Sequence, residues 1–162
     1  MSDRNFVKFT FIKLDPAWRR RDSAERAQDK LEFAAACNDF AEDHFLRTYS
    51  LVGTRGDCDV MVRTIAADLD PIHEFHVLLN QTGLMRWADI PYSYGLDDQE
   101  FVVSFNADNP GEFLDLVQEL RGTESSSYTE SETPIFTCIS ASVERALGAL
   151  DGEAVAVEPA SR

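Results

Sequence analysis

The chain has 162 residues, 44% of them hydrophobic, so it is long enough to form one compact domain with a substantial core. Its formal net charge of −14 and its pI of about 4.5 argue against nucleic acid or anionic membranes as partners, because both require basic patches. No apolar run reaches the roughly 20 residues that span a bilayer, and the first residues lack the apolar core of a signal peptide. We therefore expect a soluble cytoplasmic protein.

The first half of the chain alternates between strand and helix patterns. Aromatic and β-branched residues predict a strand that ends at Asp15-Pro16. A broad apolar stripe that includes Phe33 and Phe40 predicts a long helix. Two further strands follow, with a turn at Gly53. The predicted ranges are 6–14 for the first strand, 24–43 for the helix, and 45–52 and 58–65 for the next two strands.

The second half repeats this alternation. Asp70 and Pro71 predict the start of a second helix, with Asp70 as the capping residue, and this helix ends near Gly83. Asn109 and Glu112 have the spacing of a capping box at the start of a third helix. Strands are predicted over 86–96, 101–106 and 134–139. The three cysteines show no metal-binding spacing and are interpreted as buried or incidental thiols.

This order of elements predicts an α+β fold of the ferredoxin-like type, with an antiparallel sheet and helices on one face. We interpret 6–53 as a β-α-β remnant and 57–140 as a complete ferredoxin-like unit within one domain, 1–147. The small, acidic residues of 148–162 are predicted to be a disordered tail. Two such sheets could pack face to face within one chain or between two chains, as in a dimeric α+β barrel, so we expect a homo-oligomer, a dimer or higher.

Several segments resemble the chlorite dismutase and coproheme decarboxylase family. They occur in the family's order along residues 6–139. The segments are Lys13–Arg19, Thr48–Gly53, Asp57–Met61, Thr82–Leu84, Pro91–Tyr94, Gly95–Asp98, Leu120–Glu124 and Pro134–Phe136. The chain passes from sequence like the family's first domain to sequence like the end of its second domain at about residue 94, so it resembles a short or truncated member.

This resemblance implies a haem-binding oxidoreductase with haem b as its cofactor and a histidine as the iron ligand. The reaction implied is the conversion of chlorite, a small anion, to chloride and dioxygen. A coproheme decarboxylase-like enzyme is an alternative. It is less favoured because the family's tyrosine for that reaction belongs to the part that the chain lacks.

The candidate iron ligands are His76 and His73, both on the predicted second helix. At about 100° per residue, His76 lies beside the apolar face that Ile72 and Leu79 define, whereas His73 lies much further round the helix. A haem-ligating imidazole must face an apolar space, so His76 is the first choice.

The resemblance also suggests two further site residues. Arg86 matches the substrate side of the haem, where a guanidinium can hold an oxyanion, and it is the candidate catalytic residue. Glu124 matches the carboxylate that accepts a hydrogen bond from the ligating imidazole. A different class of function stays open, namely a haem-free, oligomeric binding or accessory protein of the same fold.

Overall fold

The computed structural model describes residues 5–95, 107–122 and 135–156. The chain divides into two compact units. The larger comprises Met1–Glu100 and Thr137–Arg162, and the smaller comprises Phe101–Phe136. The predicted strand over 101–106 lies outside the described residues. Within the smaller unit, α3 spans Pro110–Arg121. The Asn109 Oδ1 accepts a hydrogen bond from the Glu112 amide at 3.0 Å, which confirms the predicted cap.

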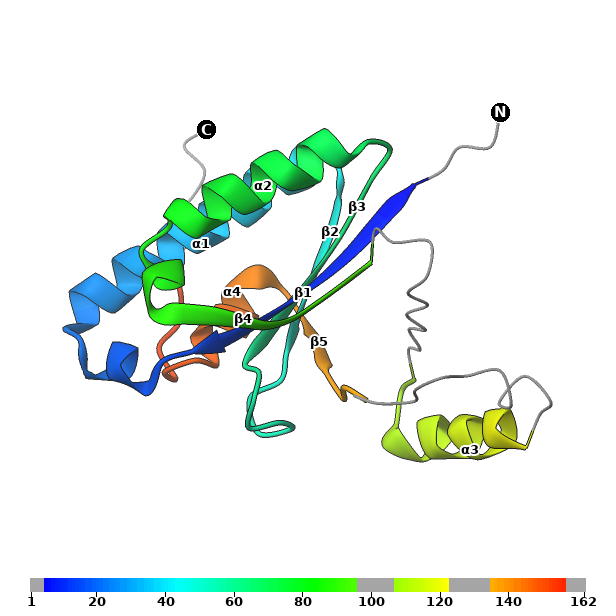
Figure 1. The fold of residues 1–162 in the computed structure, drawn as a ribbon. Helices are drawn as coiled ribbons and strands as arrows, with labels where there is room; N and C mark the ends of the chain where they lie inside the picture. Colours follow the sequence, from blue (N-terminus) through cyan, green and yellow to red (C-terminus); the bar gives the residue numbers. More distant parts are fainter. Residues whose placement is uncertain (1–4, 96–106, 123–134, 157–162) are drawn as a thin grey trace, which may run out of the picture. The chain divides into compact units, whose positions relative to one another are not determined.

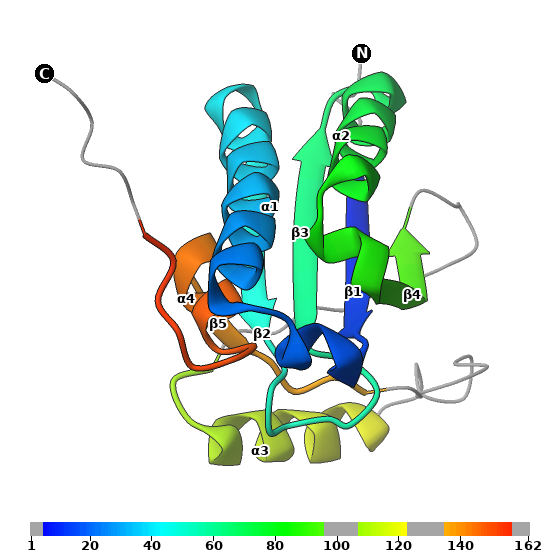
Figure 2. The same ribbon diagram turned by 90° about the vertical axis from the view of Figure 1, so that its left-hand side faces the viewer.

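The larger unit is an antiparallel sheet with helices on one face, as predicted (Figures 1 and 2). Its five strands lie in the order β4-β1-β3-β2-β5. Figure 2 shows α1 and α2 side by side in front of the strands. The element bounds are β1 Phe6–Leu14, η1 Pro16–Arg20, α1 Ser23–Asp43, β2 Phe45–Ser50, β3 Val60–Ala66, α2 Leu69–Gln81, η2 Leu84–Trp87, β4 Ala88–Gly95, β5 Ile139–Ala141 and α4 Val143–Gly148.

The sheet combines strands from 6–53 and from 57–140, the two stretches that the sequence predicted as separate units. β1, α1, β2, β3, α2 and β4 together follow the β-α-β-β-α-β order of one ferredoxin-like unit within residues 6–95. β5 extends this sheet by pairing with β2. Residues 6–53 are therefore integral to the ferredoxin-like sheet, because both strands of this stretch pair with β3.

The start of α2 differs from the sequence prediction. The helix begins at Leu69 with Asp68 as its N-cap, and Asp70 lies in the first turn. A carboxylate in the first turn still interacts favourably with the positive end of the helix dipole. The pattern located this helix correctly to within a residue or two, which is the usual uncertainty at a helix end.

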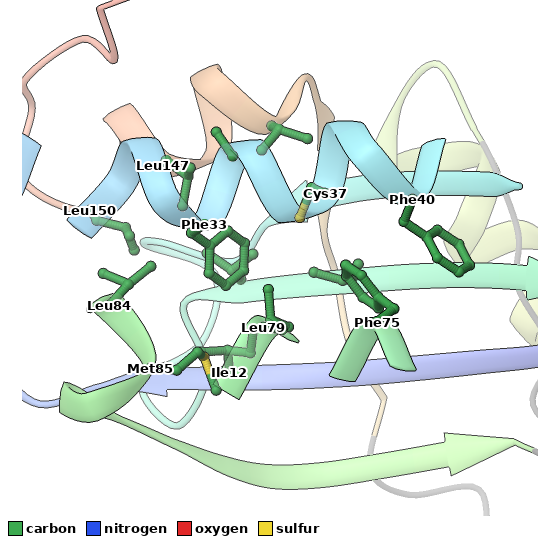
Figure 3. Packing of buried hydrophobic residues seen from close by; sticks show 14 of the residues in the cluster. Ile12, Phe33, Cys37, Phe40, Phe75, Leu79, Leu84, Met85, Leu147 and Leu150 are labelled. Carbon is green, nitrogen blue, oxygen red and sulfur yellow. The ribbon is translucent and has the colours of Figure 1, made fainter. Parts of the chain in front are cut away.

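The core lies between the helices and the sheet (Figure 3). Phe33 and Cys37 from α1 and Leu79 from α2 are fully buried, and they contact strand residues such as Ile12 and Val62. Each large apolar side chain buried in this way stabilises the fold by about 1.5–3 kcal/mol. Burial of the Cys37 thiol raises its pKa well above the ordinary value, so this cysteine stays protonated, in agreement with the predicted buried thiol.

The segment after α4 is packed on α1. Lys30 of α1 is only 1% exposed, and its Nζ donates to the Asp151 Oδ1 at 2.8 Å and to the Glu153 carbonyl at 2.7 Å. The Nε of Arg26 donates to the Asp151 Oδ2 at 3.0 Å, and Val155 is buried. We expected disorder after residue 148 from composition, but these ion pairs hold the described part of the segment, 149–156, against the helix.

We predict that Lys30→Met lowers the free energy of unfolding by about 3–5 kcal/mol, because it leaves the buried Asp151 carboxylate without its closest cation. Urea denaturation measures this change. Glu25→Gln is the control, because the Glu25 side chain is 55% exposed in its (i,i+4) ion pair with Arg21 and such pairs contribute about 1 kcal/mol or less. Equal losses in the two variants would contradict the prediction.

Candidate functional site

His76 lies at the border of the buried face of α2. Ile72, Phe75 and Leu79 point into the core and are at most 3% exposed. His76 lies next to this row on the helix and is half-buried. Its ring packs edge-on against the Phe75 ring, with centroids 5.1 Å apart. The helical geometry expected from the sequence is therefore the geometry of the structure.

Both ring nitrogens of His76 have partners inside the protein. The Ile72 carbonyl, one turn earlier on α2, lies 2.8 Å from the Nδ1, and the Thr10 Oγ1 of β1 lies 2.7 Å from the Nε2. A carbonyl oxygen can only accept, so Nδ1 carries the proton and Nε2 accepts the hydroxyl hydrogen of Thr10. Thr10 is 1% exposed. The imidazole therefore links helix and sheet.

The surroundings of His76 favour its neutral form. Burial lowers the pKa of the imidazole, and the charges of Lys8 and His73 act in the same direction, while the hydrogen bond to the Ile72 carbonyl opposes them. The neutral ring is also the form that accepts the Thr10 hydrogen. His76 is therefore unprotonated at neutral pH.

This shift predicts a pH-dependent stability. The pKa of His76 is lower in the folded state than its ordinary value of about 6.5, so below that pH the unfolded chain binds more protons and the folded state loses stability. We expect urea denaturation to show this loss as the pH falls below about 6.5, and the loss to be absent in His76→Gln. His73→Gln, which changes an exposed residue of the same helix, should behave like the wild type. The same acid loss in all three proteins would contradict the assignment.

The other candidate ligands lie elsewhere. His73 is exposed on α2. His44 follows α1, where its ring lies 4.8 Å from that of Phe40. The chain has three histidines, at positions 44, 73 and 76, and all three lie in the described range 5–95. Glu124 lies outside the described residues.

Arg86 lies apart from His76. It is an exposed residue of η2 and lines a cavity of about 260 Å³. The other residues that line this cavity are Arg21, Asp29, Gly83 and Trp87. The structure thus places the candidate catalytic arginine beside η1 and α1, and His76 is not among the lining residues.

The wall of this cavity is a network around the buried Asp29. Its Oδ2 accepts a hydrogen bond from the Trp18 indole at 2.9 Å, and its carboxylate forms an ion pair with Arg21. The Arg21 guanidinium lies over the Trp87 ring, 5.2 Å from its centroid. Sequence analysis did not identify these residues as a site. The basic run from Trp18 to Arg21 was the signal that could have indicated it.

Gly83 allows the close contact between η2 and α1. A Cβ at this position would collide with the Asp29 Oδ1. The Gly83 amide donates to the Glu32 Oε2 at 2.7 Å, and this hydrogen bond is the main cause of the lowered pKa of Glu32. The cavity lining therefore combines two arginines with one carboxylate, that of Asp29, and the Glu32 carboxylate lies next to it through its bond to the Gly83 amide.

The residues around His76 do not fit a porphyrin. A ligating imidazole needs a free nitrogen that faces an apolar space, whereas Nε2 is already paired with Thr10 in the centre of the packed sheet. Among the residues that the structure describes, no cluster of three histidine, cysteine or acidic side chains could hold a metal ion. Haem ligation by His76 would therefore require the hydrogen bond to Thr10 to break.

The family model of chlorite dismutase matches residues 25–94 and 87–141. The chain belongs to the chlorite dismutase family. The two matched segments overlap at 87–94, close to residue 94, where the sequence resemblance changes from one domain of the family to the other.

The comparisons with individual proteins agree with this family. A coproheme decarboxylase from Mycolicibacterium smegmatis is 34% identical over an alignment of 96 residues that covers 55% of this chain and 41% of that protein. The chain thus spans about two fifths of the length of this relative. No described helix is long and apolar enough to cross a membrane.

Solved structures support the fold. A mutant chlorite dismutase from Candidatus Nitrospira defluvii superimposes with a TM-score of 0.76 at 11% identity, covering 88% of this chain and 94% of that chain. Another mutant from the same organism gives a TM-score of 0.55 at 16% identity, covering 83% and 52%. At these identities the likeness concerns the fold alone.

Proposed function

We propose that this member of the chlorite dismutase family is a haem-free binding or accessory protein, in which His76 has a structural role. The observation that carries this proposal is the 2.7 Å hydrogen bond between the Nε2 of the half-buried His76 and the hydroxyl of the buried Thr10. A haem at His76 would have to break this bond and separate α2 from β1. Among the remaining histidines, His73 is exposed, and His44 packs on Phe40.

Self-association is part of the proposal. α1, α2 and α4 lie on one face of the sheet, and the opposite face carries no described helix of the same unit (Figure 2). Sheets with one covered face commonly bury the other against a second layer. A symmetric dimer is the simplest closed assembly.

Titration of the purified protein with haemin and with coproheme tests the structural role of His76. We expect no Soret shift of the kind that histidine ligation produces, and we expect wild type, His76→Ala and His73→Ala to give the same spectra. His73→Ala is the matched control, because it removes an exposed imidazole from the same helix. A Soret band present in wild type and in His73→Ala but lost in His76→Ala would overturn the proposal.

A second candidate function is a haem b oxidoreductase that decomposes chlorite, with coproheme decarboxylation as its alternative. The tautomer of His76 favours it, because a ligating histidine commonly donates its second N–H to a carbonyl or a carboxylate. The likeness to a coproheme decarboxylase also favours a tetrapyrrole-related role. In this candidate, Arg86 would act on the small anionic substrate and Glu124 would support the imidazole.

Oxygen release from chlorite separates the two candidate functions. With haemin present, we expect the protein to release no more oxygen than haemin alone, and we expect Arg86→Ala to behave like the wild type. Release above the haemin background that falls at least about tenfold in Arg86→Ala would favour the oxidoreductase, since a guanidinium that holds an oxyanion stabilises it by charge-assisted hydrogen bonds.

A further inference from the structure

The face of the sheet opposite the helices carries two arginines side by side. Arg47 of β2 and Arg63 of β3 are direct partners in the strand register. Residues alternate between the two faces of a strand. The neighbours Leu46 and Val62 pack into the core beneath the helices, so both guanidinium groups extend from the other face. Like charges directly opposite each other destabilise a sheet unless something compensates them.

Aromatic rings hold these guanidinium groups in place. The Cζ of Arg63 lies 5.5 Å from the centroid of the Phe45 ring and 5.6 Å from that of Phe9. The Cζ of Arg47 lies 5.7 Å from the same Phe45 ring. Guanidinium groups placed against aromatic rings keep their planar set of N–H donors available to a ligand. The rings thus pre-organise two cations around Phe45.

Two buried polar atoms of this patch have no hydrogen-bond partner among the residues that the structure describes. They are the Nε of Arg63 and the phenolic oxygen of Tyr49, whose residue is only 6% exposed. Tyr49 is opposite Met61 in the register, so it is the diagonal neighbour of Arg63 on the same face. A buried donor without an acceptor is costly. Both atoms can donate a hydrogen bond, and both belong to the face of the sheet that carries the arginine pair.

The charges around this pair differ from those around other arginines of the chain. Arg21, Arg26 and Arg55 each form an ion pair with an aspartate. Within the described part of the chain, no ion pair joins Arg47 or Arg63 to an acidic residue. This is unusual in a protein with 29 acidic and 15 basic residues. The described residues therefore offer Arg47 and Arg63 no anionic hydrogen-bond acceptor.

We propose that Arg47, Arg63 and Tyr49 form a binding site for a small carboxylate or phosphate on this face of the sheet. The two planar guanidinium groups match the oxygen geometry of such anions and can donate to them bidentately, and the Tyr49 hydroxyl supplies a further donor. The site does not depend on the haem question, because it lies on the opposite face of the sheet from His76. A carboxylate of a second copy of the chain would offer the same chemistry, so the experiment separates these two sources.

Isothermal titration calorimetry with oxalate and with inorganic phosphate tests the site, at matched ionic strength against sodium chloride. We expect one site per chain, and an affinity at least about tenfold weaker in Arg47→Gln and in Arg63→Gln, because each variant removes charged hydrogen bonds to the anion. Arg145→Gln is the control, because it removes the same charge from an exposed position on α4 and should leave the affinity unchanged.

Three outcomes would overturn the proposal. The first is the absence of saturable heat with both probes. The second is equal weakening by Arg145→Gln, which would reduce the effect to general electrostatics. The third is sedimentation data in which Arg47→Gln or Arg63→Gln dissociates an oligomer while neither probe binds, which would assign the pair to an interface between copies. Arg47 is exposed, so its variant keeps the test valid if Arg63→Gln fails to fold.

Discussion

The packing of α1 and α2 on one face of the sheet is the constraint on which both sites depend. Alternation along β1 directs Thr10 and Ile12 to the helices and Phe9 to the opposite face. The helix side is filled by Phe33, Leu79 and their neighbours. The same geometry therefore closes the space beside His76 and leaves the arginine pair on the other face.

His76 illustrates how one arrangement can prepare a residue for two roles. The bond from Nδ1 to the Ile72 carbonyl fixes the tautomer and directs Nε2 inward. In a metal site the same orientation would present the Nε2 lone pair to iron. In this protein the Nε2 lone pair accepts a hydrogen bond from the Thr10 hydroxyl instead. The chain covers about two fifths of its coproheme decarboxylase relative, and its likeness to solved chlorite dismutases concerns the fold. Family membership and haem ligation by this histidine are thus separate questions.

The arginines of this acidic protein have two kinds of surroundings. Arg26 and Arg21 connect α1 to the segment after α4 and to η1 through buried aspartates, and their charges are compensated inside the molecule. Arg47 and Arg63 are instead placed against aromatic rings. A charge with an internal partner contributes to the fold, while one held by rings remains available to an external anion.

The sequence by itself determined the α+β class and most of the elements, because these depend on local periodicity and on caps such as Asn109 with Glu112. It indicated the family through the order of the segments that resemble it. It also determined that His76, rather than His73, faces inward, since helical geometry orders residues around the axis. Only the tertiary structure decided that Thr10 donates a hydrogen bond to the His76 imidazole and that Arg47 lies opposite Arg63. It also decided that Asp151, in the segment after α4, pairs with Lys30 of α1. These contacts join residues far apart in the chain, and their partners depend on strand register and packing, which local patterns do not specify.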